Sequence, residues 1–300
     1  MTTFSAEPSA DEPTEARRSQ LTRDELRFDV IEVGPPDGEP VVLLHGFPQF
    51  SGSWDALVAL LTQQGYRTLM MDQRGYSVGA RPRGRWTYRM SELVADVVAL
   101  IDARGGGPVH LVGHDWGAAV AWALTARRPE KVCSLTALSV PHPWGFITAM
   151  ATSAQGLKSW YMYFFQLPWL PERLLHAQGV RFLTMFGQSP ERARRDAARF
   201  PDPAALTGPL NWYRAMTFID PRAAMKPVRR PTLFVWSDGD SAISRQAAET
   251  CERYVDAPYQ FETLRGVNHW IPEAATSELA ALLIPHLQRW SAGSSTAPSR

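Results

Sequence analysis

Asp115 stands where an acidic side chain could act as a nucleophile. It lies in LVGHDWGAAVAW (residues 111–122), in which an apolar strand-like run becomes a helical pattern between Gly113 and Gly117. Glycines on both sides of such a turn let the strand and the helix pass closely, while the residue at the apex takes strained backbone angles and points away from the sheet. The free N–H groups and the dipole of a helix start keep a carboxylate ionised. We therefore interpret Asp115 as a nucleophile; the alternative is an inert helix-capping aspartate.

A second stretch, VVLLHGFPQF (residues 41–50), offers a backbone donor for such a nucleophile. Its buried strand ends at His45-Gly46-Phe47-Pro48. A loop in this position can supply one N–H group to an oxyanion hole, and the residue after the nucleophile supplies the other. We expect these donors to be the backbone N–H groups of Phe47 and Trp116. His45 is expected to be a hydrogen-bonded loop anchor and not a base.

An acid and a histidine follow Asp115 along the chain, each after a strand-like run. TLFVWSDGDSAIS ends a strand with Asp238 and Asp240, and FETLRGVNHWIPE places His269 between the last strand and the final helix. Side chains at the carboxyl ends of parallel strands can meet at one edge of the sheet. We prefer Asp240 because it lies deeper in the loop before the next helix, and Asp238 remains the alternative. Of the seven histidines, only His269 has this placement.

Alternating strands and helices must position these residues. Apolar strand-like runs alternate with helical patterns near residues 54–64, 91–103, 116–127, 244–254 and 273–290. This alternation predicts an α/β fold whose mostly parallel sheet is covered by helices on both faces. It is interrupted at residues 141–226, which contain no clean strand and 14 of the 32 aromatic residues. We expect a helical cap with an apolar pocket there, on a core of residues 21–140 and 227–290.

The chain ends and the composition narrow the remaining possibilities. Residues 1–20 and 291–300 are polar and lack an apolar run long enough for a signal peptide or a membrane span, so we expect a disordered leader and tail. A net charge of +1 gives no general attraction to nucleic acid, which favours a small neutral ligand. Cys133 and Cys251 form neither a disulfide framework nor a zinc motif. We expect a cytoplasmic protein without a metal or another cofactor; no oligomeric state is indicated.

Several blocks of the chain resemble the epoxide hydrolases of the α/β-hydrolase superfamily: HGFPQFSGSW, DQRGYSVGARP, GHDWGAAVAW and GVNHWIPEA. The resemblance implies the α/β-hydrolase fold, with the cap inserted after the sixth strand. The cap of that family carries two tyrosines that bind the epoxide oxygen, one near a YFQ-type segment and one in NWYR. Here WYMYFFQ and GPLNWYRA imply Tyr213 for one role and Tyr161 or Tyr163 for the other. The spacing from Gln166 favours Tyr161.

The resemblance also explains why a carboxylate stands at the turn. An epoxide has no carbonyl for a serine to attack, whereas a carboxylate can attack its saturated ring carbon and form an ester. The resemblance implies that Asp115 forms this ester while Tyr161 and Tyr213 assist the departing ring oxygen. His269, oriented by Asp240, would then activate water to hydrolyse the ester.

Two alternatives to a small apolar epoxide as substrate follow from the same residues. A haloalkane or haloacid dehalogenase uses the same attack, but it often has asparagine where this chain has Phe47, and haloacetate dehalogenases have arginine where it has Trp116. The paired cap tyrosines favour the epoxide. A ligand-binding protein without turnover would usually lack a member of the triad, and Asp115, Asp240 and His269 are all present.

Overall fold

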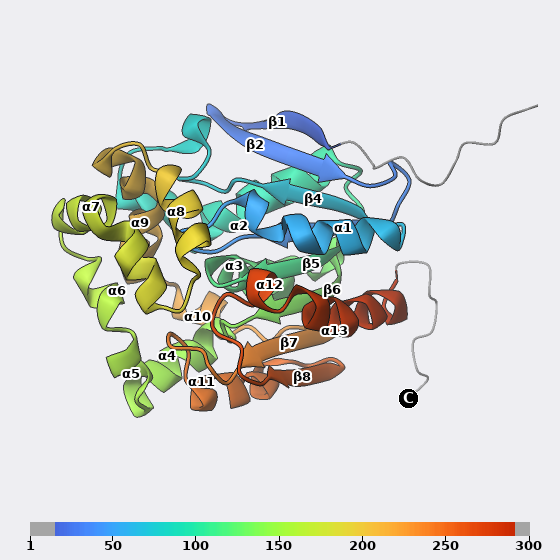
Figure 1. The fold of residues 1–300 in the computed structure, drawn as a ribbon. Helices are drawn as coiled ribbons and strands as arrows, with labels where there is room; N and C mark the ends of the chain where they lie inside the picture. Colours follow the sequence, from blue (N-terminus) through green and yellow to red (C-terminus); the bar gives the residue numbers. More distant parts are fainter. Residues whose placement is uncertain (1–15, 292–300) are drawn as a thin grey trace, which may run out of the picture.

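The computed structural model describes residues 16–291. Eight strands form one sheet in the order β1-β2-β4-β3-β5-β6-β7-β8. The pairs β1–β2 and β2–β4 are antiparallel, and the strands from β4 to β8 in this order are parallel (Figure 1). The predicted α/β fold with a mostly parallel sheet is confirmed. The strands are β1 (Arg17–Arg23), β2 (Leu26–Val33), β3 (Pro40–Leu44), β4 (Arg67–Met71), β5 (Val109–His114), β6 (Val132–Leu138), β7 (Thr232–Ser237) and β8 (Tyr259–Leu264).

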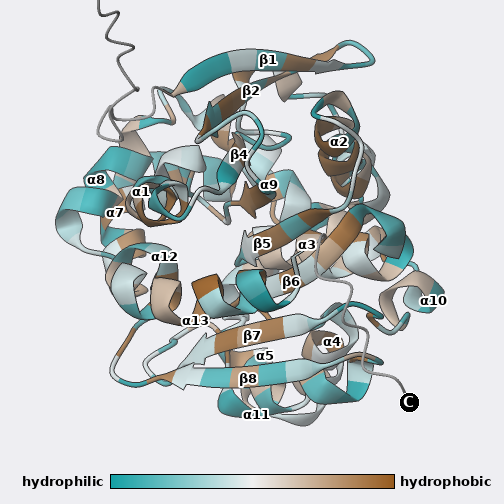
Figure 2. Cartoon of the chain, turned by 90° about the vertical axis from the view of Figure 1, so that its right-hand side faces the viewer, coloured by the Kyte–Doolittle hydropathy of each residue, from teal (hydrophilic) through white to brown (hydrophobic). Residues whose placement is uncertain are grey.

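Helices cover both faces of the sheet. Successive residues of a strand point to opposite faces, so Val42 and Leu44 of β3 belong to one apolar cluster while Val41 and Leu43 belong to the other. Because both faces are covered, the central strands read as continuous apolar runs, and Figure 2 shows β5 and the middle of β7 in brown, whereas the edge strand β8 is largely teal. One cluster includes α2 (Met90–Ala103) and α3 (Trp116–Arg127), and the other includes α1 (Asp55–Gln63) and α13 (Thr276–Arg289).

The predicted leader of residues 1–20 is wrong in its last part. Arg17–Arg23 form β1, which pairs with β2 over its whole length. Only Leu21 in this strand is buried. The strand is stabilised by backbone pairing and by ion pairs such as Arg17–Glu32 at 2.6 Å, and an apolar pattern could not reveal it. The rest of the expected leader, residues 1–15, and residues 292–300 of the expected tail lie outside the described residues.

Two predicted helices are divided in the structure. Residues 244–254 form α11 (Arg245–Glu249) and then a separate 3-10 turn. Residues 273–290 include the end of α12 (Ile271–Ala274) and all of α13, and Ala275 separates these two helices. Because of this break, the loop that carries His269 is followed by the short helix α12 and not directly by the long helix α13.

Helices α4 to α10 connect β6 to β7. Figure 1 shows most of them gathered at the end of the sheet where the parallel strands terminate. Ion pairs join α8 and the residue that follows it to the core: Arg195 of α8 to Glu273 at 2.7 Å, and Arg199 to Asp72 at 2.8 Å. These helices, called the insertion below, are α4 (Pro143–Thr152), α5 (Gln155–Lys158), α6 (Trp160–Phe164), α7 (Leu170–Met185), α8 (Pro190–Ala198), α9 (Thr207–Arg214) and α10 (Pro221–Ala224). None of the helices in residues 16–291 is long and apolar enough to cross a membrane.

Candidate active site

Asp115 stands at the turn between β5 and α3 with strained backbone angles, φ 52° and ψ −120°. The glycines around it are required by space. A Cβ atom at Gly113 would overlap the backbone of Gly117, and one at Gly117 would overlap the carbonyl of Leu44. A Cβ atom at Gly46 would overlap the side chain of Asp115 itself. The close passage expected between strand and helix is present, and the need for glycine at position 46 had not been expected.

The carboxylate of Asp115 is held as an anion. Its Oδ1 accepts a hydrogen bond of 2.7 Å from the backbone N–H of Phe47, and its Oδ2 lies 3.5 Å from Nε2 of His269. Burial raises the pKa of this carboxyl, but the contact with the His269 side chain and the positive charge of His269 outweigh burial and lower the pKa below its usual value. Trp116 is the first residue of α3, so its backbone N–H has no carbonyl partner within the helix. This N–H lies at the start of the helix, directly after Asp115.

His269 and Asp240 form a buried hydrogen-bonded pair. Nδ1 of His269 lies 2.8 Å from Oδ2 of Asp240, and Oδ1 of Asp240 accepts the N–H groups of Ala242 and Ile243 at 2.7 and 2.9 Å. Asp238 is exposed and accepts the N–H of Gly266 instead, so the structure brings Asp240 and not Asp238 to the histidine. Burial lowers the pKa of His269, but the charge of Asp240 and the interactions with Asp115 outweigh it and raise the pKa to about 10.

The loop that carries His269 is fixed to the ends of three neighbouring strands. The carbonyl of His269 accepts hydrogen bonds from Nε2 of His114 at 2.8 Å and from the hydroxyl of Ser139 at 3.1 Å. The carbonyl of Asn268 accepts one from the hydroxyl of Ser237 at 2.9 Å. His114 ends β5, Ser139 follows β6 and Ser237 ends β7. Sequence reasoning missed these supporting residues, although polar side chains at the ends of buried strands are the signal that could have found them.

Two tyrosines of the insertion complete the site. Tyr161 from α6 and Tyr213 from α9 have ring centroids 6.1 Å apart, and both border the same cavities as Asp115. Burial, followed by the negative charge of Asp115, raises the pKa of both phenols, so both stay protonated and can donate. Tyr163 is 62% exposed and lines neither cavity. The structure therefore brings Tyr161, and not Tyr163, to Asp115.

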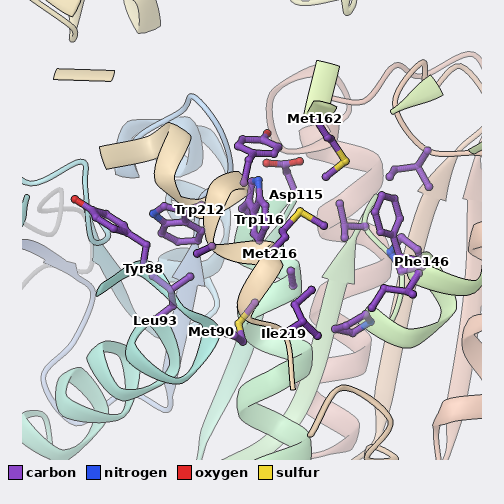
Figure 3. A pocket seen from close by; sticks show the side chains of 18 of the residues that line it. Tyr88, Met90, Leu93, Asp115, Trp116, Phe146, Met162, Trp212, Met216 and Ile219 are labelled. Atoms are coloured by element: carbon purple, nitrogen blue, oxygen red, sulfur yellow. The ribbon is translucent and has the colours of Figure 1, made fainter. Parts of the chain in front are cut away.

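The space around Asp115 is divided into two lobes. The large lobe has a volume of about 90 Å³, the small lobe has about 30 Å³, and Asp115, Tyr161 and Tyr213 border both. Figure 3 shows the Asp115 carboxylate with the rings of Trp116 and Trp212 beside the large lobe. The other side chains that line this lobe are mostly apolar and include Met90, Leu93, Phe146, Met162, Met216 and Ile219.

The small lobe lies on the side of His269. Its wall includes Phe186 and Leu183 from the insertion and Trp270 from the core. Among residues 16–291 no group of three histidine, cysteine, aspartate or glutamate side chains is placed to hold a metal ion. The groups that the structure brings together at the site are a buried carboxylate, a histidine–aspartate pair and two protonated phenols.

Comparisons with known proteins identify the family. Residues 39–275 match the family model described as alpha/beta hydrolase fold. The chain is 34% identical to the AB hydrolase superfamily protein YfhM of Bacillus subtilis, over 88% of this chain and 95% of that protein. It is 31% identical to human epoxide hydrolase 4, over 83% of this chain and 72% of that protein.

The crystal structure of epoxide hydrolase A from Mycobacterium thermoresistibile superimposes with a TM-score of 0.80 at 26% identity. The match covers 91% of this chain and 98% of that one. Fold, site and relatives agree: the chain belongs to the α/β-hydrolase fold family, and within that family to the epoxide hydrolases.

Proposed function

We propose that the protein hydrolyses epoxides to vicinal diols through a covalent ester on Asp115. The observation that carries this proposal is the pairing of a buried anionic carboxylate with two buried, protonated phenols at the border of one apolar cavity. Opening an epoxide needs a nucleophile for the ring carbon and a donor for the ring oxygen at the same time. In this role the insertion is a cap, because it brings both donors over the nucleophile.

In the first step the Oδ2 atom of Asp115 attacks a ring carbon, and the bond between that carbon and the ring oxygen breaks. Tyr161 and Tyr213 donate to the departing oxygen, which takes a proton from one of the phenols. Oδ1, which the N–H of Phe47 already holds, becomes the carbonyl oxygen of the ester. The donor of the future oxyanion hole is therefore in place before the ester exists.

In the second step His269 removes a proton from water, and the water oxygen attacks the carbonyl carbon of the ester. The N–H groups of Phe47 and Trp116 stabilise the oxyanion that forms on Oδ1. When the ester bond breaks, the diol oxygen takes the proton from His269, and the acid proton of Asp115 restores the phenol. Esterification has removed the charge of Asp115, and this lowers the pKa of His269, so the imidazolium of the resting enzyme releases its proton to solvent water before the imidazole acts as a base. When the charge of Asp115 returns at the end of the cycle, His269 takes up a proton from solvent water again.

Two of the three tryptophans that line the lobes argue against a dehalogenase, while the third, Trp116, is compatible with either leaving group. A halide leaving group is stabilised by weak N–H donors such as indoles, but Nε1 of Trp212 already donates to the carbonyl of Arg74 at 2.8 Å. Nε1 of Trp270 likewise donates to the carbonyl of Phe186 at 2.9 Å. The complete set of Asp115, His269 and Asp240 also favours turnover over ligand binding alone. The cytoplasmic location expected from the cysteines stays a prediction.

A single turnover in oxygen-18 water, with enzyme in excess, tests the proposal. If Asp115 attacks the ring carbon, the oxygen added to the first diol comes from its carboxylate, so this diol carries no label. The peptide that contains Asp115 should gain one heavy oxygen, which peptide mass spectrometry can measure. A labelled first diol with an unlabelled Asp115 peptide would mean that water attacks the epoxide directly, and the nucleophile assignment would be wrong.

A further inference from the structure

We infer that this chain acts preferentially on terminal epoxides that carry one bulky apolar substituent, and poorly on epoxides with a bulky group on both ring carbons. The inference rests on the proposed function, because it concerns the substrate that would lie between Asp115 and the two tyrosines. It follows from the unequal sizes and the unequal stiffness of the two lobes that meet there.

The lobes differ threefold in volume. A substrate whose ring lies between Asp115, Tyr161 and Tyr213 must direct its substituents into the lobes that these residues border. The large lobe offers about 90 Å³ and the small lobe about 30 Å³. The small lobe therefore leaves much less room for a second bulky substituent than the large lobe leaves for the first. A neighbouring void of about 20 Å³ shares four lining residues with the small lobe, and even together the two are smaller than the large lobe.

The wall of the small lobe is braced. Phe186 and Trp270 form part of this wall, and Nε1 of Trp270 donates to the carbonyl of Phe186 at 2.9 Å. The amide of Asn268 donates to the carbonyl of Gly187 at 2.6 Å. Both bonds join the end of α7 to the loop of His269, which the core strands hold. Moving this wall outward would break these bonds and displace the loop that carries the proposed base, so only a smaller side chain in the wall can enlarge the lobe.

The large lobe is adaptable and apolar. Methionines at positions 90, 162 and 216 line it, and their unbranched side chains can change rotamer to fit different shapes. Apart from Asp115, its lining contains no charged side chain. An aryl or alkyl group can enter without losing polar contacts, whereas a charged substituent would be buried without a partner. One bulky, uncharged substituent is therefore the shape that the two lobes accept.

Three related epoxides test the inference: styrene oxide, trans-1-phenylpropene oxide and trans-stilbene oxide. The second substituent grows from hydrogen to methyl to phenyl while the first stays constant. Chromatography of the diols gives kcat/KM for each. We expect the methyl group to change kcat/KM by no more than about tenfold and the second phenyl group to lower it by about 100-fold or more, since discrimination measures the difference in transition-state binding.

The outcomes separate the two proposals. If none of the three epoxides gives a diol, the proposed function is wrong. If styrene oxide is hydrolysed and trans-stilbene oxide has a kcat/KM within about tenfold of it, the function stands and the inference about the lobes is overturned.

Substitutions in the two lobes locate the cause. Phe186→Ala should raise the ratio of kcat/KM for trans-stilbene oxide to that for styrene oxide by about tenfold, because it opens the small lobe. Phe186→Leu is a milder change that should raise the ratio less. The matched control is Phe146→Ala, which opens the large lobe and should not raise the ratio. If both changes at Phe186 leave the ratio unchanged, or if the Phe146 variant raises it equally, the small lobe does not set the preference.

Discussion

Replacing Asp115 by asparagine should strongly lower the pKa of His269. An amide has nearly the size of the carboxylate but no charge, so Asp115→Asn imitates the electrostatic state of the enzyme after ester formation. In the unmodified protein, burial of His269 is outweighed by the interactions with Asp240 and Asp115, and its pKa is raised to about 10. Such a histidine is protonated at neutral pH and cannot accept a proton from water. The proposed second step therefore requires that loss of the Asp115 charge releases this proton.

The size of the effect follows from one distance. Nε2 of His269 lies 3.5 Å from Oδ2 of Asp115. At an effective dielectric constant of about 20, two unit charges at this separation interact with about 4.7 kcal/mol. A pKa difference of one is worth about 1.4 kcal/mol, so removing the charge should lower the pKa of His269 by about 3. The expected value in the variant is then close to neutral, where an imidazole is a useful base.

An NMR titration of the imidazole nitrogens measures this pKa directly, and the spectrum of His269→Gln assigns the signal. Asp238→Asn is the matched control, because it removes an exposed carboxylate that follows the same strand as Asp240 and does not contact His269. Its effect on the pKa should stay below about 0.5, as expected for an exposed charge screened by water. If the pKa in Asp115→Asn stays near that of the unmodified protein, ester formation does not convert His269 into a base, and the electrostatic account of the second step fails.

Three further outcomes are expected. His269→Gln should form the ester and then stall, so intact-protein mass spectrometry should show the added mass of one epoxide; a folded, substrate-binding variant without this adduct would place His269 in the first step. Tyr213→Phe should slow ester formation in pre-steady-state kinetics by about 10²- to 10⁴-fold, whereas Tyr163→Phe, at an exposed position, should not; equal rates for both variants would contradict the assignment of the phenols. Burial raises the pKa of Asp196 to about 6 in the folded state, above its usual 3.8, so its ionisation destabilises the fold as pH rises from about 4 to 6 and above. Asp196→Asn should therefore raise Tm at pH 7.5, where the carboxylate is ionised, and not at pH 4, where it is protonated. The new amide can donate to Oε1 of Gln188, which has no partner among the described residues, so the substitution keeps a hydrogen bond. An equal change in Tm at both pH values would refute this.

The strand ends explain why the central site could be predicted from the sequence. Asp115, Asp240 and His269 each follow an apolar run, and parallel strands bring such positions to one edge of the sheet. Gly113 and Gly117 flank Asp115 because larger side chains would overlap the backbone there, and a short stretch of sequence is enough to show this pattern. Tyr161 and Tyr213 required the resemblance to a family, because no local pattern tells which tyrosines of a helical segment point inward.

Other features depend on tertiary contacts that the sequence does not display. β1 is an edge strand held by backbone pairing, and among its side chains only Leu21 is buried. The hydrogen bond from the side chain of His114 to the carbonyl of His269 joins two residues that are 155 positions apart in the chain. The unequal lobes result from how α6, α7 and α9 pack over the sheet. The number of aromatic residues in this segment could indicate that a pocket exists, but not that it is divided into two lobes.

The anchoring of the His269 loop has a consequence for how such enzymes can diversify. The carbonyl of His269 is bonded by His114, the direct neighbour of Asp115, and by Ser139 at the end of the next strand. Asp115 and His269 thus share the ends of β5 and β6 as anchors, and β7 adds a third anchor for the His269 loop. Many side chains that shape the large lobe come instead from the insertion. Mutations in the insertion can therefore change which substrates are accepted while the spacing between Asp115 and His269 is inherited unchanged, so substrate range and hydrolytic chemistry can evolve as separate traits.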